Sequence, residues 1–499
     1  MRSLIALLAL VGTCATAAPL PEANPSHLPR WRGFNLLEKF QFSGTHQPFR
    51  EDDFRWIAKF GFNFVRLPLD YRGYIVDGDW NRFDEEALGQ IDQAVAWGRQ
   101  YGIHVCLNLH RAPGWTVAKP PEAKSLWTDA DARQAAVGHW AMFARRYRGV
   151  PNTNLSFNLF NEPAGVAEHA YVAVVREVAA AIRAEDPQRL VICDGLQWGT
   201  LPVAEFVPLQ VAMMTRGYAP FHLTHFQAAW TQSHDTHRPT PCWPAMDGTG
   251  GTLLGPAKGE LSRPLQVSGP LAAGTRLRLV VTTLSSRAVL TVCGDAGREL
   301  WRQALSAGPE LGPWRKNTFE DRWKSWRAEG EVEFCVKLTE PTQTLTLRVV
   351  DGDWLTLGLL GVGAPGGAPE AVARLNPSWE QVPEILSYDA TDPAQPRLGA
   401  RHDRAWLRDQ TIRPWQAFEA AGGGVMVGEW GAYHFTPHPV VLGWADACLR
   451  NWQDAGWGWA LWNFRGTFGI LDSDRKDVHY EDFEGHRLDR QFLELLQRY

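Results

Sequence analysis

The sequence predicts a (β/α)8 TIM barrel with a β-sandwich domain inserted after its sixth strand. From residue 31, short apolar runs alternate with longer segments of helical periodicity, as they do in parallel barrels. Between about Gly248 and Val372 this alternation stops, and strand-like runs such as RLRLVVTT and GEVEFCVKL replace it. Joints rich in Gly and Pro, DGTGGTLLGPAKG and GVGAPGGAPE, flank this region and indicate where an inserted domain begins and ends.

Eight short apolar segments have the length and composition of barrel strands. In chain order they are Gly33–Asn35, Phe62–Leu67, His104–Leu109, Leu155–Phe160, Leu190–Asp194, Phe221–His225, Val425–Glu429 and Gly456–Asn463. Helical periodicity occupies the intervals at Glu51–Phe60, Asp84–Tyr101, Asp129–Tyr147, Glu168–Glu185, Ala405–Ala421 and Val440–Ala455. In a closed parallel barrel the carboxyl ends of all eight strands would meet at one rim.

The insert is expected to span residues 248–372, with the barrel formed by residues 19–247 and 373–499. A barrel tolerates such an insert in a surface loop because a longer loop costs little additional closure entropy. The run DGDWLTLGLLGV resembles the last strands of carbohydrate-binding jelly rolls, so the insert is expected either to bind glycan or to serve as a rigid lid. Its tryptophans available for stacking are Trp301, Trp314, Trp323, Trp326 and Trp354.

Residues 1–18 have the features of a cleavable export signal. Arg2 provides a positive start, Leu4–Val11 an apolar centre and Ala15–Ala18 a cleavage zone of small residues. The apolar run is too short to span a bilayer. A lipoprotein anchored at Cys14 is the alternative, although Thr13 poorly matches the small residue that a lipid-attachment box requires. The mature protein is therefore expected to be secreted or periplasmic, with no membrane span.

The composition excludes some partners and suggests another. The formal net charge is −5 and the sequence pI is about 6.3, so no nucleic-acid or acidic-membrane partner is expected. The chain has 24 tryptophans, and their flat rings suit sugars as well as protein cores. Of the six cysteines after the signal, Cys293 and Cys335 share the β-rich region and are the best candidates for a disulfide, whereas Cys106, Cys193 and Cys448 read as buried thiols. None has metal-site spacing, and no metal or organic cofactor is expected.

Two predicted strands each end in a glutamate. The run LSFNLFNEPAG places Glu162 directly after the fourth strand, where Pro163 should end the ladder. The run GGGVMVGEWGAY places Glu429 at the end of the seventh. Two carboxylates at one rim are the equipment for cleaving a glycosidic bond, since one can donate a proton while the other attacks or activates water.

These motifs, in this order, resemble glycoside hydrolase family 5, the cellulase-type retaining hydrolases. The similarity includes GFNFVRLPLDY, LNLHRAPGW, HLTHFQAAW and GWGWALWNFRGTFGILDSDR and covers most of Trp31–Tyr499 outside the insert. The resemblance implies that Glu162 is the general acid/base and Glu429 the nucleophile, with their carboxylates about 5 Å apart. It implies further roles in holding the nucleophile ionised or in binding substrate for Arg66, His110, Asn161, His225 and Trp462.

The sequence departs from the family at one position. The family commonly has a tyrosine just after the sixth-strand histidine, and its hydroxyl contacts the nucleophile. Here His225 is followed by Phe226 and Gln227, so the partner of Glu429 is expected from elsewhere. Four further tryptophans near strand ends could line the cleft: Trp115, Trp127, Trp198 and Trp230.

The sequence thus predicts a secreted, monomeric, retaining endo-β-1,4-glucanase acting on β-glucan or another plant-type polysaccharide. On the same scaffold, β-mannan, β-1,3-glucan and glucosides, including a glucoside lipid, remain open as substrates. A non-catalytic glycan-binding protein on an enzyme scaffold is the alternative from another class, and the presence of both glutamates argues against it.

Overall fold

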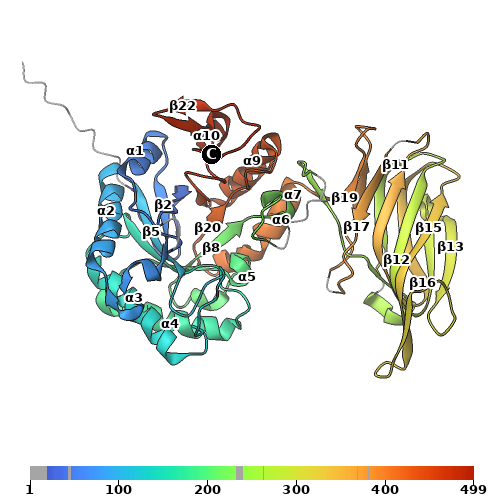
Figure 1. Cartoon of the computed structure of the whole chain (residues 1–499), viewed down its shortest axis with the longest axis horizontal. Coiled ribbons are helices and arrows are strands. Elements are labelled where there is room, and N and C mark those ends of the chain that lie inside the picture. The colour runs from blue at the N-terminus through green and yellow to red at the C-terminus, as the bar shows by residue number, and fades with distance from the viewer. Residues whose placement is uncertain (1–19, 43–45, 232–239, 262, 368, 380) are drawn as a thin grey trace, which may run out of the picture. The chain divides into compact units, whose positions relative to one another are not determined.

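The computed structural model describes residues 20–499 except 43–45, 232–239, 262, 368 and 380. The predicted export signal at residues 1–18, with Cys14, lies outside the described residues. The chain divides into two compact units (Figure 1). The barrel unit comprises Met1–Thr240 and Leu407–Tyr499, and the insert unit comprises Pro241–Trp406.

The barrel unit contains the predicted closed barrel of eight parallel strands, in the order β1-β2-β5-β6-β7-β8-β20-β21. Seven of the eight predicted segments contain or overlap a barrel strand, and the fourth coincides with one. The strands are β1 (Arg32–Asn35), β2 (Phe64–Asp70), β5 (His104–Arg111), β6 (Leu155–Phe160), β7 (Val191–Asp194), β8 (Ala212–Gly217), β20 (Val425–Trp430) and β21 (Trp459–Leu461).

The predicted sixth strand is wrong. Residues Phe221–Thr224 form the short helix α6, and the sixth strand is β8, nine residues earlier. Pro220 stands immediately before α6 and supplies no backbone donor for a ladder. The β8 segment has the sequence AMMTRG. All six residues are buried, but the charged Arg216 makes the segment look unlike a buried strand. Arg216 is tolerated there because other barrel strands supply its anionic partners.

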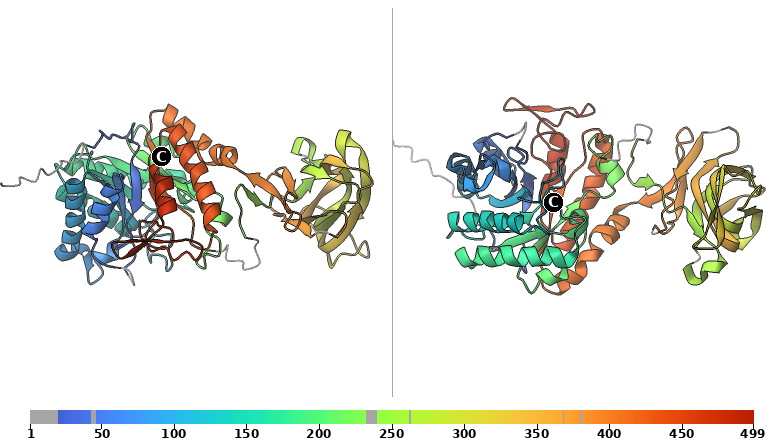
Figure 2. Two further views of the ribbon diagram at one scale, coloured as in Figure 1. Left: turned by 90° about the horizontal axis from the view of Figure 1, so that it is seen from above. Right: turned by 60° about the horizontal axis from the view of Figure 1, so that its bottom comes forward.

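Helices surround the barrel between its strands (Figures 1 and 2). The long ones are α1 (Glu51–Lys59), α2 (Glu85–Tyr101), α3 (Ala130–Arg146), α4 (Glu168–Glu185) and α9 (His438–Ala455). The helix expected at Ala405–Ala421 is divided into α7 (Arg404–Thr411), η5 (Arg413–Trp415) and α8 (Gln416–Ala420), because Pro414 interrupts it. Smaller elements are η1 (Tyr71–Gly73), β3 (Ile75–Val76), β4 (Asp79–Phe83), α5 (Leu196–Gly199), η2 (Ala204–Phe206), β22 (Glu481–Phe483), β23 (His486–Leu488) and α10 (Arg490–Gln497). Across the described part of the chain, no helix is both long and apolar enough to cross a membrane.

The barrel interior changes from apolar to polar along the strand direction. At the strands' amino-terminal ends, Trp31, Phe64, Ile192 and Met426 belong to one buried apolar cluster. Further along the strands the buried side chains are polar, among them Asn35, Arg66, Asn158, Asp194 and Glu429. The apolar end closes the barrel, and the carboxyl end is left for chemistry.

The insert unit is a β domain whose eleven described strands form one hydrogen-bonded network. Two long strands, β12 (Arg276–Cys293) and β16 (Thr342–Gly363), run side by side with several register shifts, at which β-sheets bend. One half of the β12–β16 ladder is flanked by β15 and β17, and the other half by β13 and β11. The other strands are β9 (Ala245–Asp247), β10 (Thr252–Leu254), β11 (Leu265–Leu271), β13 (Glu299–Ser306), β14 (Lys316–Glu320), β15 (Ser325–Lys337), β17 (Glu370–Arg374), β18 (Leu386–Asp389) and β19 (Arg397–His402), with turns η3 (Pro256–Leu261) and η4 (Asp295–Gly297).

This unit differs from the expectation in extent and in its cysteines. It spans Pro241–Trp406 rather than 248–372, because β9, β18 and β19 join its sheet. Cys293 and Cys335 form no disulfide, so that expectation is wrong. Cys335 lies opposite Arg278 on β12, whereas Cys293 is at the far end of the same strand. Cys106, Cys193 and Cys448 are buried free thiols, as predicted.

Candidate active site

The two glutamates at the rim of the barrel share a partner. Glu429 belongs to β20, and Glu162 follows β6 by two residues. Arg216 of β8 donates from Nε to Glu162 Oε1 over 3.0 Å and from Nη2 to Glu429 Oε1 over 3.2 Å. Because one guanidinium group touches both carboxylates, the two lie close together at the carboxyl ends of their strands.

Glu429 has three donors and is almost fully buried. Arg66 Nη1 donates to its Oε1 over 2.6 Å, and Arg216 donates to the same oxygen. The hydroxyl of Tyr218 lies 3.3 Å from Oε2. Two guanidinium groups and a phenol thus surround this carboxyl group, which stands at the position that a nucleophile would occupy.

Glu162 is held in a different electrostatic environment. Its backbone is in the left-handed region, with φ 50°, and its N–H donates to Asp194 Oδ2 over 2.8 Å. The pKa of Glu162 is raised to about 7, first by burial and then by the neighbouring charge of Glu429, although Arg216 opposes the shift. Its side chain retains 17% exposure, so a ligand can reach it. A carboxyl that keeps its proton near neutral pH is suited to act as a general acid.

Arg66 lies where an arginine can support the nucleophile. It is fully buried and donates from Nε to Asn158 Oδ1 over 2.9 Å and from Nη1 to Asn35 Oδ1 over 3.0 Å. Its Nη2 donates to Asn161 Oδ1 over 2.9 Å. These bonds fix the plane of the guanidinium group, so that Nη1 is aimed at Glu429.

Asn161 and His110 both leave a polar atom available. Asn161 Oδ1 accepts from Arg66 and Arg216, whereas its Nδ2 is buried with no hydrogen-bond partner among the residues that the structure describes. His110 Nδ1 is in the same condition. Burial, reinforced by the charges of Arg66 and Arg216, lowers the pKa of His110 to about 3, so the ring is neutral. Sugar hydroxyls are natural partners for such unpaired buried groups.

Trp462, just after β21, stacks on His110 with ring centroids 5.5 Å apart. Phe40 packs edge-on against both rings. Trp462 is therefore held in place by neighbouring rings and presents an aromatic surface at the barrel rim that carries the two glutamates. An aromatic surface of this kind is suited to stacking on a ligand ring.

His225 does not end a strand. It follows α6, its Nδ1 lies 3.0 Å from Thr224 Oγ1, and it stacks on Phe221. Burial lowers its pKa to about 4. Its other ring contacts are with Tyr218, Trp230 and Phe468, and of these Tyr218 also contacts Glu429. In the described structure no hydrogen bond or ion pair joins His225 to Glu162, beside which it was predicted.

The expected tryptophans differ in role. Trp115 donates from Nε1 to the carbonyl of Asn161 over 2.7 Å and packs on Trp127, so it orients the Asn-Glu pair. Trp198 is 57% exposed, and its backbone N–H points to the carbonyl of Pro163 over 3.4 Å. Trp230 is 61% exposed and meets Tyr433 edge-on. The two exposed rings are the ones free to stack on a ligand.

Sequence reasoning missed three residues of this site: Tyr218, Arg216 and Asp194. Tyr218 supplies the phenol that was expected from elsewhere, and it was overlooked because the sixth strand was placed too far along the chain. Asp194 ends β7 and accepts from Asn158, Arg216 and the Glu162 backbone. An acidic residue that ends an apolar strand, as in VICD, was an available signal.

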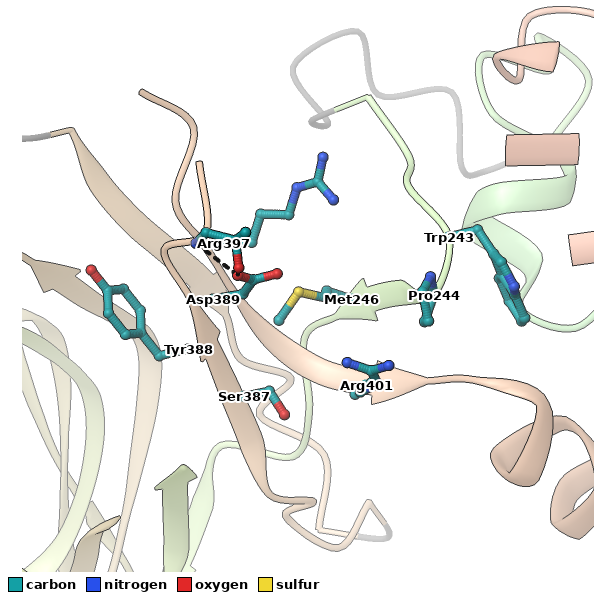
Figure 3. A pocket seen from close by; sticks show the side chains of 9 residues that line it. Trp243, Pro244, Met246, Ser387, Tyr388, Asp389, Arg397 and Arg401 are labelled. Atoms are coloured by element: carbon teal, nitrogen blue, oxygen red, sulfur yellow. Dashed lines mark hydrogen bonds between the residues drawn. The ribbon is translucent and has the colours of Figure 1, made fainter. Parts of the chain in front are cut away.

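A concave region lies in the insert unit (Figure 3). This pocket encloses about 340 Å³ and is lined by residues of β9, β18 and β19 with Trp243. Its only carboxylate is Asp389, so it lacks the pair that the barrel rim provides. Within the described ranges, no group of three or more His, Cys, Asp and Glu side chains could hold a metal ion.

A parallel barrel with two differently tuned carboxylates at the ends of its fourth and seventh strands defines a glycosidase-type protein. Comparison with known proteins agrees. Residues 23–236 match the family described as cellulase (glycosyl hydrolase family 5). This range contains Glu162 and ends before Glu429.

The chain is 27% identical over 200 residues to endoglucanase C of Acetivibrio thermocellus, covering 39% of this chain and 58% of that protein. It is 26% identical over 190 residues to cellodextrinase A of Ruminococcus flavefaciens, covering 36% of this chain and 55% of that protein. A solved glycoside hydrolase structure superposes with a TM-score of 0.59 at 23% identity, over 94% of this chain and 99% of that one. The chain thus spans less than two thirds of the length of these curated relatives. The match over residues 23–236 and these relatives support a glycoside hydrolase family 5 protein.

Proposed function

We propose that the protein is an exported, retaining glycoside hydrolase that cleaves β-linked polysaccharide, with β-1,4-glucan as its preferred substrate. The observation that carries the proposal is that one arginine contacts two carboxyl groups with different environments. Glu429, next to two cations and a phenol, is equipped to attack. Glu162, with its raised pKa, is equipped to donate a proton.

In the first step, Glu162 gives its proton to the oxygen of the leaving sugar while Glu429 attacks the anomeric carbon. The glycosidic C–O bond breaks, and a covalent ester forms between the sugar and Glu429. Asn161 Nδ2 is positioned to donate to a sugar hydroxyl, since it is buried and lacks a partner within the described chain. Such a bond strengthens as charge develops on the sugar ring.

In the second step, Glu162 is ionised and removes a proton from water. The water attacks the anomeric carbon, the ester bond breaks, and Glu429 leaves as a carboxylate. Tyr218 and the two arginines then stabilise the returning charge. No step requires a metal or an organic cofactor.

The preference for β-1,4-glucan is supported by the names of the relatives, endoglucanase C and cellodextrinase A. β-Mannan and β-1,3-glucan are the principal alternatives, since a relative in Aspergillus fumigatus is named a probable glucan 1,3-beta-glucosidase and is 29% identical over 182 residues. The exposed rings of Trp198 and Trp230 and the half-buried ring of Trp462 are proposed to stack on successive sugars. Export is proposed from the residues before position 19, and the mature protein is proposed to be a monomer.

The substrate is tested with a reducing-sugar assay on carboxymethylcellulose, mixed-linkage glucan, mannan and xylan. We expect hydrolysis of the first two to exceed that of the others. We expect Glu162→Gln and Glu429→Gln each to lower kcat by about 10³-fold or more on a natural glucan, because each removes a group that acts in the transition state. Glu177→Gln, on the outer surface of α4, is the matched control and should behave as the wild type. Turnover near normal in either active-site variant contradicts the assignment.

For the insert, we propose glycan binding rather than a purely structural role, because of the pocket in Figure 3. Trp243 offers a ring, and Asp389, Arg397 and Arg401 offer polar groups elsewhere in the same lining. Of the tryptophans considered from the sequence, Trp314 is buried, Trp301 and Trp326 pack on the domain core, and Trp323 is exposed on the β14–β15 turn. Affinity electrophoresis of the full chain in β-glucan gels distinguishes glycan binding from a structural role. Trp243→Ala should abolish the retardation that the insert causes in the gel, whereas Trp323→Ala should leave it unchanged.

A further inference from the structure

Arg216 contacts four side chains of the site, and both glutamates are among them. Its Nε binds Glu162, and its Nη2 binds Glu429, Asp194 and Asn161 Oδ1, the last over 3.0 Å. The aliphatic part of its side chain is also fixed: a Cβ on Gly199 would lie 2.7 Å from Arg216 Cγ. The side chain is 2% exposed. Arg216 is therefore held by packing as well as by charge, and it cannot leave one carboxylate without disturbing the others.

The charges around Arg216 can be counted. The cations are Arg66 and Arg216, and the carboxyl groups are Asp194, Glu162 and Glu429. Further titratable groups interact with the cluster and are neutral near pH 7. Burial lowers the pKa of His110 to about 3, and burial raises the pKa of Tyr218, Tyr171, Cys106 and Cys193. With all three carboxyls ionised, the cluster carries one net negative charge. With one proton on Glu162, its net charge is zero.

The proposed reaction preserves this neutrality. When the glycosyl-enzyme forms, the proton of Glu162 leaves with the departing sugar oxygen, and Glu429 loses its charge by becoming an ester. One negative charge thus disappears at Glu429 as another appears at Glu162, and one oxygen of each carboxyl group accepts a hydrogen bond from Arg216 in the free protein. The reverse exchange accompanies hydrolysis of the ester.

We propose that Arg216 is a positioning residue that holds both glutamates on one guanidinium group and keeps their buried cluster electrically neutral in both steps of the reaction. The proposal rests on the proposed retaining mechanism. An arginine is suited to this role because it stays charged throughout the working pH range, and its planar fork addresses two acceptors at once. A lysine could supply the charge but not both contacts, and a histidine would lose its charge near neutral pH.

Removing Arg216 has a specific consequence. The cluster would keep one cation against three carboxyl groups, so a proton on Glu162 would be retained more strongly. Glu162 would remain able to donate in the first step, but in the second step a larger fraction of it would be protonated again at a given pH and would not be available as a base. The glycosyl-enzyme should then accumulate. In the plot of kcat against pH, the acidic limb should move to higher pH.

The kinetic test compares the wild type with Arg216→Met and Arg216→Lys on a 2,4-dinitrophenyl β-cellobioside, whose leaving group needs no acid. We expect Arg216→Met to show a burst of dinitrophenolate followed by slow turnover, with azide accelerating turnover because it replaces water without needing a base. We expect the acidic limb to rise by about one pH unit or more in Arg216→Met, a tenfold change in proton affinity, and by less in Arg216→Lys. Arg189→Met, which removes a buried arginine paired with Asp186 away from the rim, should not move the limb.

A readout without catalysis keeps the proposal separate from the proposed function. The full chain labelled with ¹³C at glutamate carboxyls is titrated by NMR, with Glu162 assigned from Glu162→Gln. The Glu162 pKa should rise in Arg216→Met and move less in Arg216→Lys. If the wild type hydrolyses no glycoside, the proposed function fails, and the titration still decides the role of Arg216. Identical titration of Glu162 in wild type and Arg216→Met, in folded protein, overturns the proposal, as does a pH profile that is merely lower without moving.

Discussion

Removing the Tyr218 hydroxyl should weaken the reaction without weakening the fold. The hydroxyl lies 3.3 Å from Glu429 Oε2, longer than the usual distance for a hydroxyl on a carboxylate. A hydrogen bond to a charged group contributes about 1.5–3 kcal/mol, and the length of this one favours the lower end. Tyr218→Phe is therefore expected to lower kcat/KM by about tenfold, equivalent to roughly 1.4 kcal/mol.

The assay is steady-state hydrolysis of an aryl β-cellobioside over pH 4–9, together with thermal unfolding of each variant. Tyr433→Phe is the matched control, since it removes the phenol of a ring that packs on Trp230 and that makes no hydrogen bond to Glu429 in the described structure. It should retain wild-type kinetics. A Tyr218→Phe enzyme with unchanged kcat/KM at every pH would refute the reasoning that this phenol stabilises the nucleophile. A loss confined to thermal stability would refute it equally.

Two further predictions concern stability and binding. Glu38 is mostly buried, and burial, followed by the charge of Asp53, raises its pKa from 4.5 to about 7. Its contribution to the free energy of unfolding is therefore complete below pH 4.5 and is lost as the pH rises through 7. Between pH 5 and pH 8 the wild type should therefore lose about 2 kcal/mol more unfolding free energy than Glu38→Gln, measured by urea denaturation, and equal losses would contradict the shift. Trp462→Ala should raise KM for cello-oligosaccharides by about tenfold or more, because it removes the aromatic surface stacked on His110, while Trp406→Ala in the insert unit should leave KM unchanged. An unaltered KM in Trp462→Ala would show that substrate does not use this ring.

The barrel could be predicted because its strands and helices carry strong local patterns. β6 coincides with its predicted segment, and α4 does so as well. Both are long, periodic and bounded by residues that stop the element, such as the Asn-Glu-Pro run after β6. The positions of Glu162 and Glu429 followed from those boundaries, and the structure places both at the same rim.

β8 could not be predicted, because its composition contradicts its environment. Arg216 lies in a fully buried strand, and the sequence alone gives no reason for a buried cation there. Its partners come from β6, β7 and β20, which lie 22 to 213 residues away along the chain. The limits of the insert were missed for a related reason. β18 and β19 belong to it because they pair with β11 and β9, which are distant in the sequence, and local patterns do not reveal such pairing. Local patterns fail where distant partners determine the structure.

The same distant partners explain why the site needs two arginines. Three carboxyl groups brought together in a buried rim would repel one another, and each would tend to keep its proton. Arg66 contacts Glu429 directly and lies 3.9 Å from Asp194, but among the described residues it forms no hydrogen bond or ion pair with Glu162. Arg216 extends the positive charge to Glu162, so that a single proton is enough to make the cluster neutral. Since glycoside cleavage moves one proton at a time, a rim that is neutral with one proton can pass through both steps without a change in its net charge. The charge that made β8 hard to recognise is therefore the feature that, in the proposed mechanism, would allow Glu162 to serve first as an acid and then as a base.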